Sequence, residues 1–226
     1  MHQRLIAAQP ISVLIAVLLL GGLASAQARR GAVPPAAATR TEPAKFECPS
    51  ALGVGVKSKL TYCDVLTGRA YADGVQIPLP PHTGPVTLRF DLHNRHLYSE
   101  ELVQAKRGYR KYTATIGVMT ADTTLLSRFT VQNEFRTVAD LIDRVPADAG
   151  GTTLKAVAPT GVESVVVTVP ARENSVSIVG EKLVVIRAEA PGTPDNFNAP
   201  GRPVALISNV TLEYRPAAAR RTAPRR

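Results

Sequence analysis

The chain has 226 residues, 45% of them hydrophobic, and carries a net charge of +9 with two cysteines and no tryptophan. This length and composition predict a globular chain with one hydrophobic core, and no segment after the N-terminal apolar one is long or apolar enough to span a membrane. The charge suggests nucleic-acid binding, but the segment 46–216 holds 18 basic and 17 acidic residues, so the excess lies in the termini. Basic tails of this kind are typically solvated, and together with the export signal described next they lead us to expect no nucleic-acid partner.

Residues 1–26 have the features of a cleaved secretory signal peptide. Arg4 gives a basic start, Ile11–Leu20 is apolar but shorter than the ~20 residues that span a bilayer, and Ala24-Ser25-Ala26 matches a signal-peptidase site. We therefore expect a secreted or periplasmic protein. Residues 27–45 are rich in Ala, Pro and Arg and predict a linker, and 217–226 predict a basic disordered tail.

The two cysteines, Cys48 and Cys63, lie about 15 residues apart in the exported part of the chain. In an oxidising compartment such a pair predicts a disulfide, which would contribute about 3 kcal/mol in the chain-entropy model. The alternative is a pair of free thiols. A metal site would need more ligands than these two residues, and the C-x-x-C redox spacing is absent.

The segment 46–216 alternates short hydrophobic runs with Gly- and Pro-rich breaks. Its clearest strand is Pro85–His93, where apolar and polar residues alternate strictly. A tight turn is predicted at Gly180 and a long loop at Pro191–Pro203. Further strands are predicted at Lys57–Leu66, Val75–Leu79, Tyr112–Val118, Leu125–Glu134, Leu154–Val157, Ser164–Val169, Ser175–Val179, Lys182–Ala188 and Val204–Tyr214.

Two short helices are also predicted. One begins after an N-cap at Ser99 and ends at Gly108, and the other covers Val138–Arg144. We therefore expect a mainly β fold, a single antiparallel β-sandwich over 46–216 that is immunoglobulin-like or jelly-roll-like, with one or two short helices. The absence of a Cys…Trp…Cys framework disfavours an antibody-type domain.

The end of the clearest strand carries the first candidate site. Two imidazoles, His93 and His96, lie near Asp91, and His82 or Glu100 would complete the ligand set of a divalent metal. Because no helix fixes the geometry of this H-x-x-H pattern, we favour surface histidines that hydrogen-bond a loop. No other cofactor is expected.

A second candidate site is a basic stretch with interleaved tyrosines, which could bind an anionic polymer. The competing interpretation is structural: the first cations cap a helix and the later ones protect the start of a strand. Tyr71 and Phe197 are further candidates for sugar stacking. Because the chain has no tryptophan, and Tyr112, Phe90 and Phe129 are expected in the core, the composition does not favour carbohydrate binding. The candidate binding residues are Tyr98, Lys106, Arg107, Tyr109, Arg110 and Lys111.

Sequence signatures of common enzymes are absent, including G-x-S-x-G, S-x-x-K, H-E-x-x-H, the P-loop and the dinucleotide glycine pattern. We expect Asp140, Asp143 and Asp148 to solvate a short helix rather than to form a catalytic pair. The sequon Asn209-Val210-Thr211 falls inside a predicted strand, which favours a chance match.

These features predict an exported, non-enzymatic β-sandwich that binds an envelope polysaccharide, an anionic polymer or another exported protein. One alternative is an assembly subunit that acts by strand addition. The other is a metal-dependent hydrolase centred on His93 and His96. Catalysis is the less favoured class, and the sequence does not determine the oligomeric state.

Overall fold

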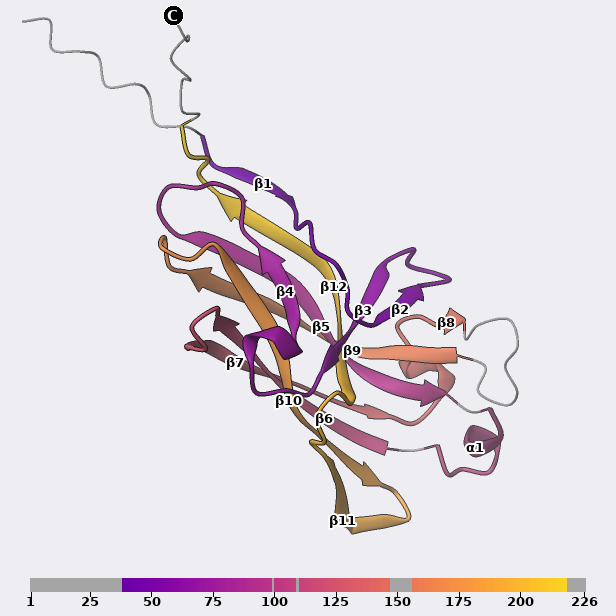
Figure 1. The fold of residues 1–226 in the computed structure, drawn as a ribbon. Coiled ribbons are helices and arrows are strands. Elements are labelled where there is room, and N and C mark those ends of the chain that lie inside the picture. Colours follow the sequence, from indigo (N-terminus) through magenta and orange to yellow (C-terminus); the bar gives the residue numbers. More distant parts are fainter. Residues whose placement is uncertain (1–37, 99, 109, 147–155, 219–226) are drawn as a thin grey trace, which may run out of the picture. The chain divides into compact units, whose positions relative to one another are not determined.

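The computed structural model describes residues 38–98, 100–108, 110–146 and 156–218 (Figure 1). The predicted signal peptide, Asp148 and the last part of the basic tail lie outside these residues. The strands form two antiparallel sheets that pack against each other, which confirms the predicted β-sandwich.

The first sheet contains, in spatial order, β2 (Ala51–Val54), β3 (Thr61–Leu66), β12 (Pro203–Tyr214), β5 (Val86–Tyr98), β9 (Ala156–Val169) and β8 (Val145–Pro146), and β1 (Arg40–Pro43) also pairs with β12. The second sheet contains β11 (Ala190–Phe197), β10 (Ser175–Arg187), β6 (Arg110–Thr120) and β7 (Leu125–Phe135), and β4 (Val75–Pro78) also pairs with β10.

Strand β5 lies between β12 and β9 and supplies the centre of the core. Val86, Leu88, Phe90 and Leu92 are at most 2% exposed, as their alternation predicted. They belong to the same buried cluster as alternate residues of the second sheet. Residues of that sheet in the cluster include Ala114, Ile116, Val118, Val176 and Ile178.

Strands β9 and β10 are each continuous where the sequence pattern predicted two short strands. The register of β10 against β6 shifts between Gly180 and Lys182, and the register of β9 against β5 shifts opposite His93, beside Gly161 with φ 68°. A β-bulge adds one residue to one strand, so it exchanges the faces to which later side chains point. The period-2 pattern therefore breaks inside each strand, and the tight turn predicted at Gly180 is wrong.

Two segments predicted to lack regular structure form edge strands. Strand β1 lies inside the predicted linker 27–45 and pairs with the end of β12. Strand β11 occupies the first half of the predicted loop Pro191–Pro203, beginning one residue before it, and forms a hairpin with β10. Proline is tolerated at a sheet edge because no neighbouring strand needs its missing N–H. Pro191 and Pro194 in β11 fit that rule.

The first predicted helix is shorter than expected. Helix α1 (Glu100–Gln104) ends before Lys106, which has φ 57°, and Arg107 N–H donates to the Leu102 carbonyl. This is the hydrogen bond of a Schellman-type helix end, so the left-handed position falls at Lys106 rather than at Gly108. No helix in the described part of the chain is long and apolar enough to cross a membrane.

The second predicted helix, Val138–Arg144, is reduced to a 3-10 turn, η2 (Val138–Asp140). The Asp140 carboxylate accepts the backbone N–H groups of Arg136 and Thr137, each at 2.8 Å, and thereby fixes this turn. Short polar side chains compete in this way with helix propagation.

The prediction that Asp143 solvates a helix is wrong, because this residue binds the loop between β2 and β3. It is 4% exposed and accepts the N–H groups of Lys57 (2.9 Å) and Ser58 (2.7 Å). Burial by itself would raise the pKa of Asp143, but the hydrogen bonds from Ser58, Lys57 and Arg144 outweigh it and lower the pKa to about 2.

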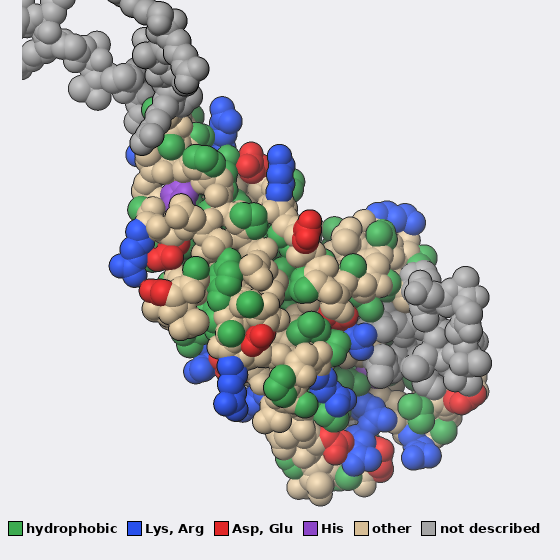
Figure 2. All heavy atoms as spheres, viewed as in Figure 1, with side chains coloured by type: hydrophobic (Ala, Val, Ile, Leu, Met, Phe, Trp, Pro, Cys, Tyr) green, Lys and Arg blue, Asp and Glu red, His purple; other side chains and the backbone are tan. Residues whose placement is uncertain are grey.

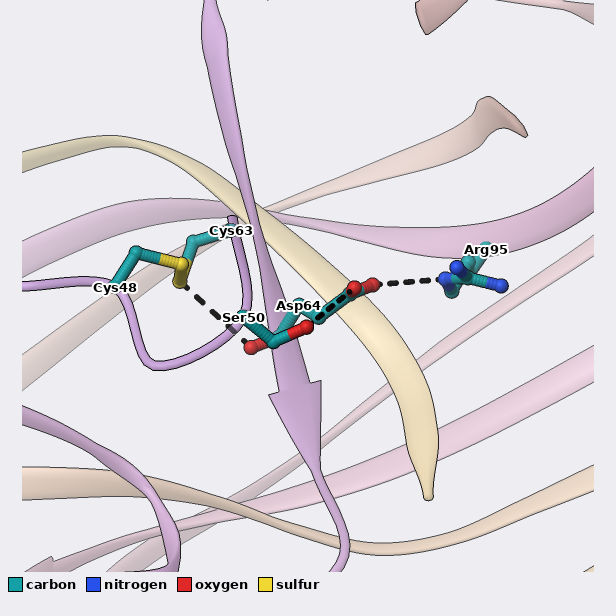
Figure 3. Close-up of a disulfide and its surroundings, with 5 residues drawn as sticks. All are labelled: Cys48, Ser50, Cys63, Asp64 and Arg95. Carbon is teal, nitrogen blue, oxygen red and sulfur yellow. Dashed lines mark hydrogen bonds and ion pairs between the residues drawn. A yellow bond between two sulfur atoms is a disulfide. The ribbon is translucent and has the colours of Figure 1, made fainter. Parts of the chain in front are cut away.

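The predicted disulfide is present and joins Cys48 to Cys63, with a Cα–Cα distance of 5.8 Å (Figure 3). It connects the segment before β2 to β3, whose residue Cys63 pairs with Ile207 of β12. A stable disulfide is typical of proteins in oxidising compartments, so this bond is consistent with export.

Gly180 lies directly against β3 and β12 of the first sheet, and we expect Gly180→Ala to destabilise the fold. A Cβ atom there would lie 2.5 Å from Val204 Cγ2 and 2.9 Å from the Leu66 carbonyl oxygen. The backbone oxygen cannot move aside without shifting β3, so overpacking should lower the free energy of unfolding by about 1–3 kcal/mol. Chemical denaturation measures the change. Gly192→Ala is the matched control, because no atom lies within 4 Å of its added Cβ, and equal stability of the two variants would contradict this account.

Candidate functional site

The two histidines of the predicted metal site lie on opposite faces of β5. His96 contacts the second sheet through Tyr112 and Phe135, whereas His93 contacts Tyr62, which belongs to a small cluster on the outer side of the first sheet. Residues three apart on a strand point to opposite faces, so this arrangement follows from the strand itself.

His93 is 2% exposed and fills the β9 bulge. Its Nδ1 lies 2.9 Å from the Gly161 carbonyl oxygen and its Nε2 lies 2.9 Å from Ser208 Oγ. Burial lowers the pKa of His93, although the Gly161 carbonyl and Asp91 partly oppose this shift. Both ring nitrogens therefore have protein partners.

His96 is also 2% exposed. Its ring stacks on Phe135 at 3.9 Å between centroids, and Nδ1 lies 2.5 Å from the Tyr112 hydroxyl. Burial, together with the nearby Arg110 guanidinium, lowers the pKa of His96 to about 4. The expectation of surface histidines is therefore wrong for both residues.

The remaining residues of the predicted metal site are also separated. Asp91 accepts the Asn209 amide at 2.7 Å and the Ser164 hydroxyl at 3.1 Å, which supports the β12 bulge where Asn209 has φ 52°. His82 pairs with Pro216, and the Glu100 side chain lies outside the described residues. Among described residues, no group of three or more His, Cys, Asp or Glu side chains is placed to hold a metal.

The predicted binding stretch does not form one surface. Arg110 and Lys111 are consecutive on β6 and therefore point to opposite faces. Lys106 and Arg107 are exposed beyond α1, where Lys106 lines a separate hollow with Arg136. The side chains of Tyr98 and Tyr109 lie outside the described residues.

Arg110 lines a cleft of about 360 Å³ near the start of β12. Five strands and α1 contribute to it, so residues far apart in sequence meet there. Figure 2 shows basic side chains, with a few acidic ones among them, at the β11 end of the molecule. The lining residues are Arg95, Leu102, Arg110, Tyr112, Leu183, Val185, Asp195, Phe197, Arg202 and Pro203.

The three arginines of the cleft differ in how they are held. Arg95 donates from Nε to the buried Asp64 carboxylate at 2.8 Å, and Ser50, close to the disulfide, donates to the same carboxylate at 3.0 Å (Figure 3). Arg110 and Arg202 form no ion pair with any described residue. The cleft therefore has two uncompensated cations beside one that is neutralised and fixed.

The cleft also has an apolar wall. Leu183 and Val185 of β10 are 7% and 6% exposed and form its floor with Tyr112. Phe197 of β11 stands at the side, with the Arg202 guanidinium 4.0 Å above its ring. Asp195 lies 3.0 Å from Arg187, but both side chains are more than a third exposed, so this ion pair offsets the charge of Asp195 only in part.

Sequence reasoning identified Arg110 and Phe197 but missed Arg95, Arg202 and Asp195. Arg95 was part of a strand end considered only for its histidines, and Asp195 and Arg202 lay in a segment predicted as a loop. The length of the predicted loop Pro191–Pro203 could have indicated Asp195 and Arg202, because long loops often carry binding residues.

The fold and the cleft define a β-sandwich with one internal disulfide and an arginine-lined cleft at one end. No family model matches the chain, and no curated protein matches it. A solved structure described as the catalytic domain of GH87 alpha-1,3-glucanase in complex with nigerose is similar, with 16% identity and a TM-score of 0.25. That alignment covers 83% of this chain but 28% of the other one, and the likeness is too low to carry an argument.

The buried His96 predicts a pH-dependent stability. Unfolded His96 titrates near 6.5 and folded His96 near 4, so the unfolded state binds the proton first as the pH falls. The free energy of unfolding should therefore fall by on the order of 3 kcal/mol between pH 6.5 and pH 4 because of this group. When the free energy of unfolding is measured by urea denaturation at several pH values, it should depend less steeply on pH for His96→Gln than for the wild type. His93 should supply part of the pH dependence that remains. Identical slopes for wild type and variant would contradict this role.

Proposed function

We propose that this chain is an exported binding module that holds an anionic polymer of the cell envelope in the arginine-lined cleft. The observation that carries the proposal is the pair of uncompensated cations, Arg110 and Arg202, beside a partly buried apolar wall. Guanidinium groups recognise carboxylate and phosphate through paired hydrogen bonds, which suits an anionic ligand.

The cleft is prepared for binding rather than formed by its ligand. Arg95 is fixed by Asp64, which in turn accepts a hydrogen bond from Ser50 next to the disulfide. Arg202 is held against Phe197. Side chains that are already ordered lose less conformational entropy when a ligand binds, which favours affinity.

The cations of the cleft should control binding. We expect Arg110→Gln and Arg202→Gln each to weaken binding of an anionic polymer about tenfold, the effect of losing one charged hydrogen bond. Binding to polygalacturonate and polyphosphate, measured by calorimetry at low salt, tests this. Arg172→Gln is the control. Arg172 lies between β9 and β10, at the end of β10 that is far from Val185 and the cleft.

Binding should also weaken as the salt concentration rises, because both cations are accessible to solvent ions. Equal binding by the wild type, the two cleft variants and the control, or no binding of either polymer, would refute the proposal.

A second function, assembly by strand addition, is favoured by the open edge of β7. Among the described strands it pairs only with β6 and ends its sheet, although its Val131 carbonyl also accepts a hydrogen bond from the Asn94 side chain at 3.2 Å. Leu125 on β7 is 43% exposed, and Val162 and Val166 on β9 are each 49% exposed. An edge strand with an exposed apolar side chain such as Leu125 is suited to accepting another strand.

If the chain assembles through this edge, sedimentation at high protein concentration should show an oligomer that Leu125→Lys dissociates. Val54→Lys is the control, because Val54 is 53% exposed but lies on β2. A monomer at all concentrations, or equal effects of the two substitutions, would argue against self-assembly.

A further inference from the structure

We infer that the cleft binds an acidic sugar residue, a sugar ring that carries a carboxylate, within an envelope polysaccharide. The inference rests on the proposed function and specifies its ligand. The guanidinium groups of Arg110 and Arg202, which have no ion-pair partner among the described residues, would by themselves bind either a carboxylate or a phosphate. Two other features of the lining distinguish these ligands.

The first feature is Asp195, an acid among the arginines. Its Oδ2 lies 3.0 Å from Arg187 Nε, an ion pair that leaves most of the lone-pair positions of the carboxylate unused. The carboxylate can therefore accept hydrogen bonds from ligand hydroxyl groups. A polyphosphate has no hydroxyl groups along its chain to donate, and Asp195 would repel its dense negative charge.

The second feature is the wall formed by Leu183, Val185 and Phe197. A sugar ring has one face of C–H groups and a rim of hydroxyl groups, so it can contact an apolar wall and a carboxylate at the same time. The volume of about 360 Å³ lies at the lower end of the range for small-ligand sites, which limits the bound part to a short segment of a polymer.

Each part of an acidic sugar thus has a matching group in the cleft. The carboxylate would lie between Arg110 and Arg202, the ring on the apolar wall, and a hydroxyl group at Asp195. An acidic peptide offers the carboxylate without the hydroxyl-bearing ring, and a neutral sugar offers the ring without the charge.

Calorimetry with the full oxidised chain tests this assignment. The probes are the trisaccharides of galacturonate, glucuronate and mannuronate, a carboxyl-reduced trisaccharide, tripolyphosphate and triglutamate. At least one acidic trisaccharide should bind about tenfold more tightly than each of the other three probes. Arg110→Gln should abolish the preference over the carboxyl-reduced trisaccharide, and Arg172→Gln should leave it unchanged.

Asp195→Asn gives the sharper result, because its effect should have opposite signs for the two kinds of anion. It should weaken the acidic trisaccharide about fivefold through loss of a charge-assisted hydrogen bond, and it should strengthen tripolyphosphate by removing a negative charge. If this variant does not fold, Phe197→Leu replaces it, and should weaken the trisaccharide more than tripolyphosphate, because both lose the contact that orders Arg202 but only the sugar ring loses its apolar wall.

The outcomes separate the two proposals. Tripolyphosphate or triglutamate bound as tightly as any acidic trisaccharide, with Arg110 required, would overturn the sugar assignment and leave the anion-binding function standing. Equal binding of the carboxyl-reduced trisaccharide would overturn the role of the carboxylate. If no anionic probe binds through Arg110, both proposals fail.

Discussion

The β-bulges in β9, β10 and β12 determine which residues of this sandwich face the core and which reach its surface. Each adds one residue to a strand and therefore exchanges the two faces of everything that follows. In β10, Val176 and Ile178 face the core before the bulge, and Leu183 and Val185 do so after it. Without the bulge, regular alternation from Ile178 would point Leu183 and Val185 outward, and the cleft would lose its apolar floor.

A chain of polar contacts connects the disulfide to the cleft. The Cys48–Cys63 bond holds Ser50 close to β3, Ser50 and Arg95 share the Asp64 carboxylate, and Arg95 lines the cleft. Asp64 is 4% exposed, so its charge is stable only while its partner stays in place. The bond that stabilises the fold in an oxidising compartment therefore also helps to position a residue of the proposed site.

The fold was largely predictable and the site was not. Alternation along β5, the Cys48–Cys63 spacing and the strong closing strand β12 are local signals, and the structure confirms all three. The helix predicted at Val138–Arg144 failed because Asp140 and Asp143 bind backbone N–H groups in a turn and a distant loop. The metal hypothesis grouped histidines that are neighbours in sequence, but a strand directs them to opposite faces.

The sequence by itself determined the class of the protein: a β-sandwich with one disulfide, its strands set by residues that alternate within a few positions of each other. Only the tertiary structure decided which cations matter. Arg110 became part of a cleft because β11 and the start of β12 place Phe197 and Arg202 beside it, and Lys111, its neighbour in sequence, did not. Alternation is a local property that a sequence displays, whereas the convergence of distant residues depends on register and bulges that arise only when strands pair.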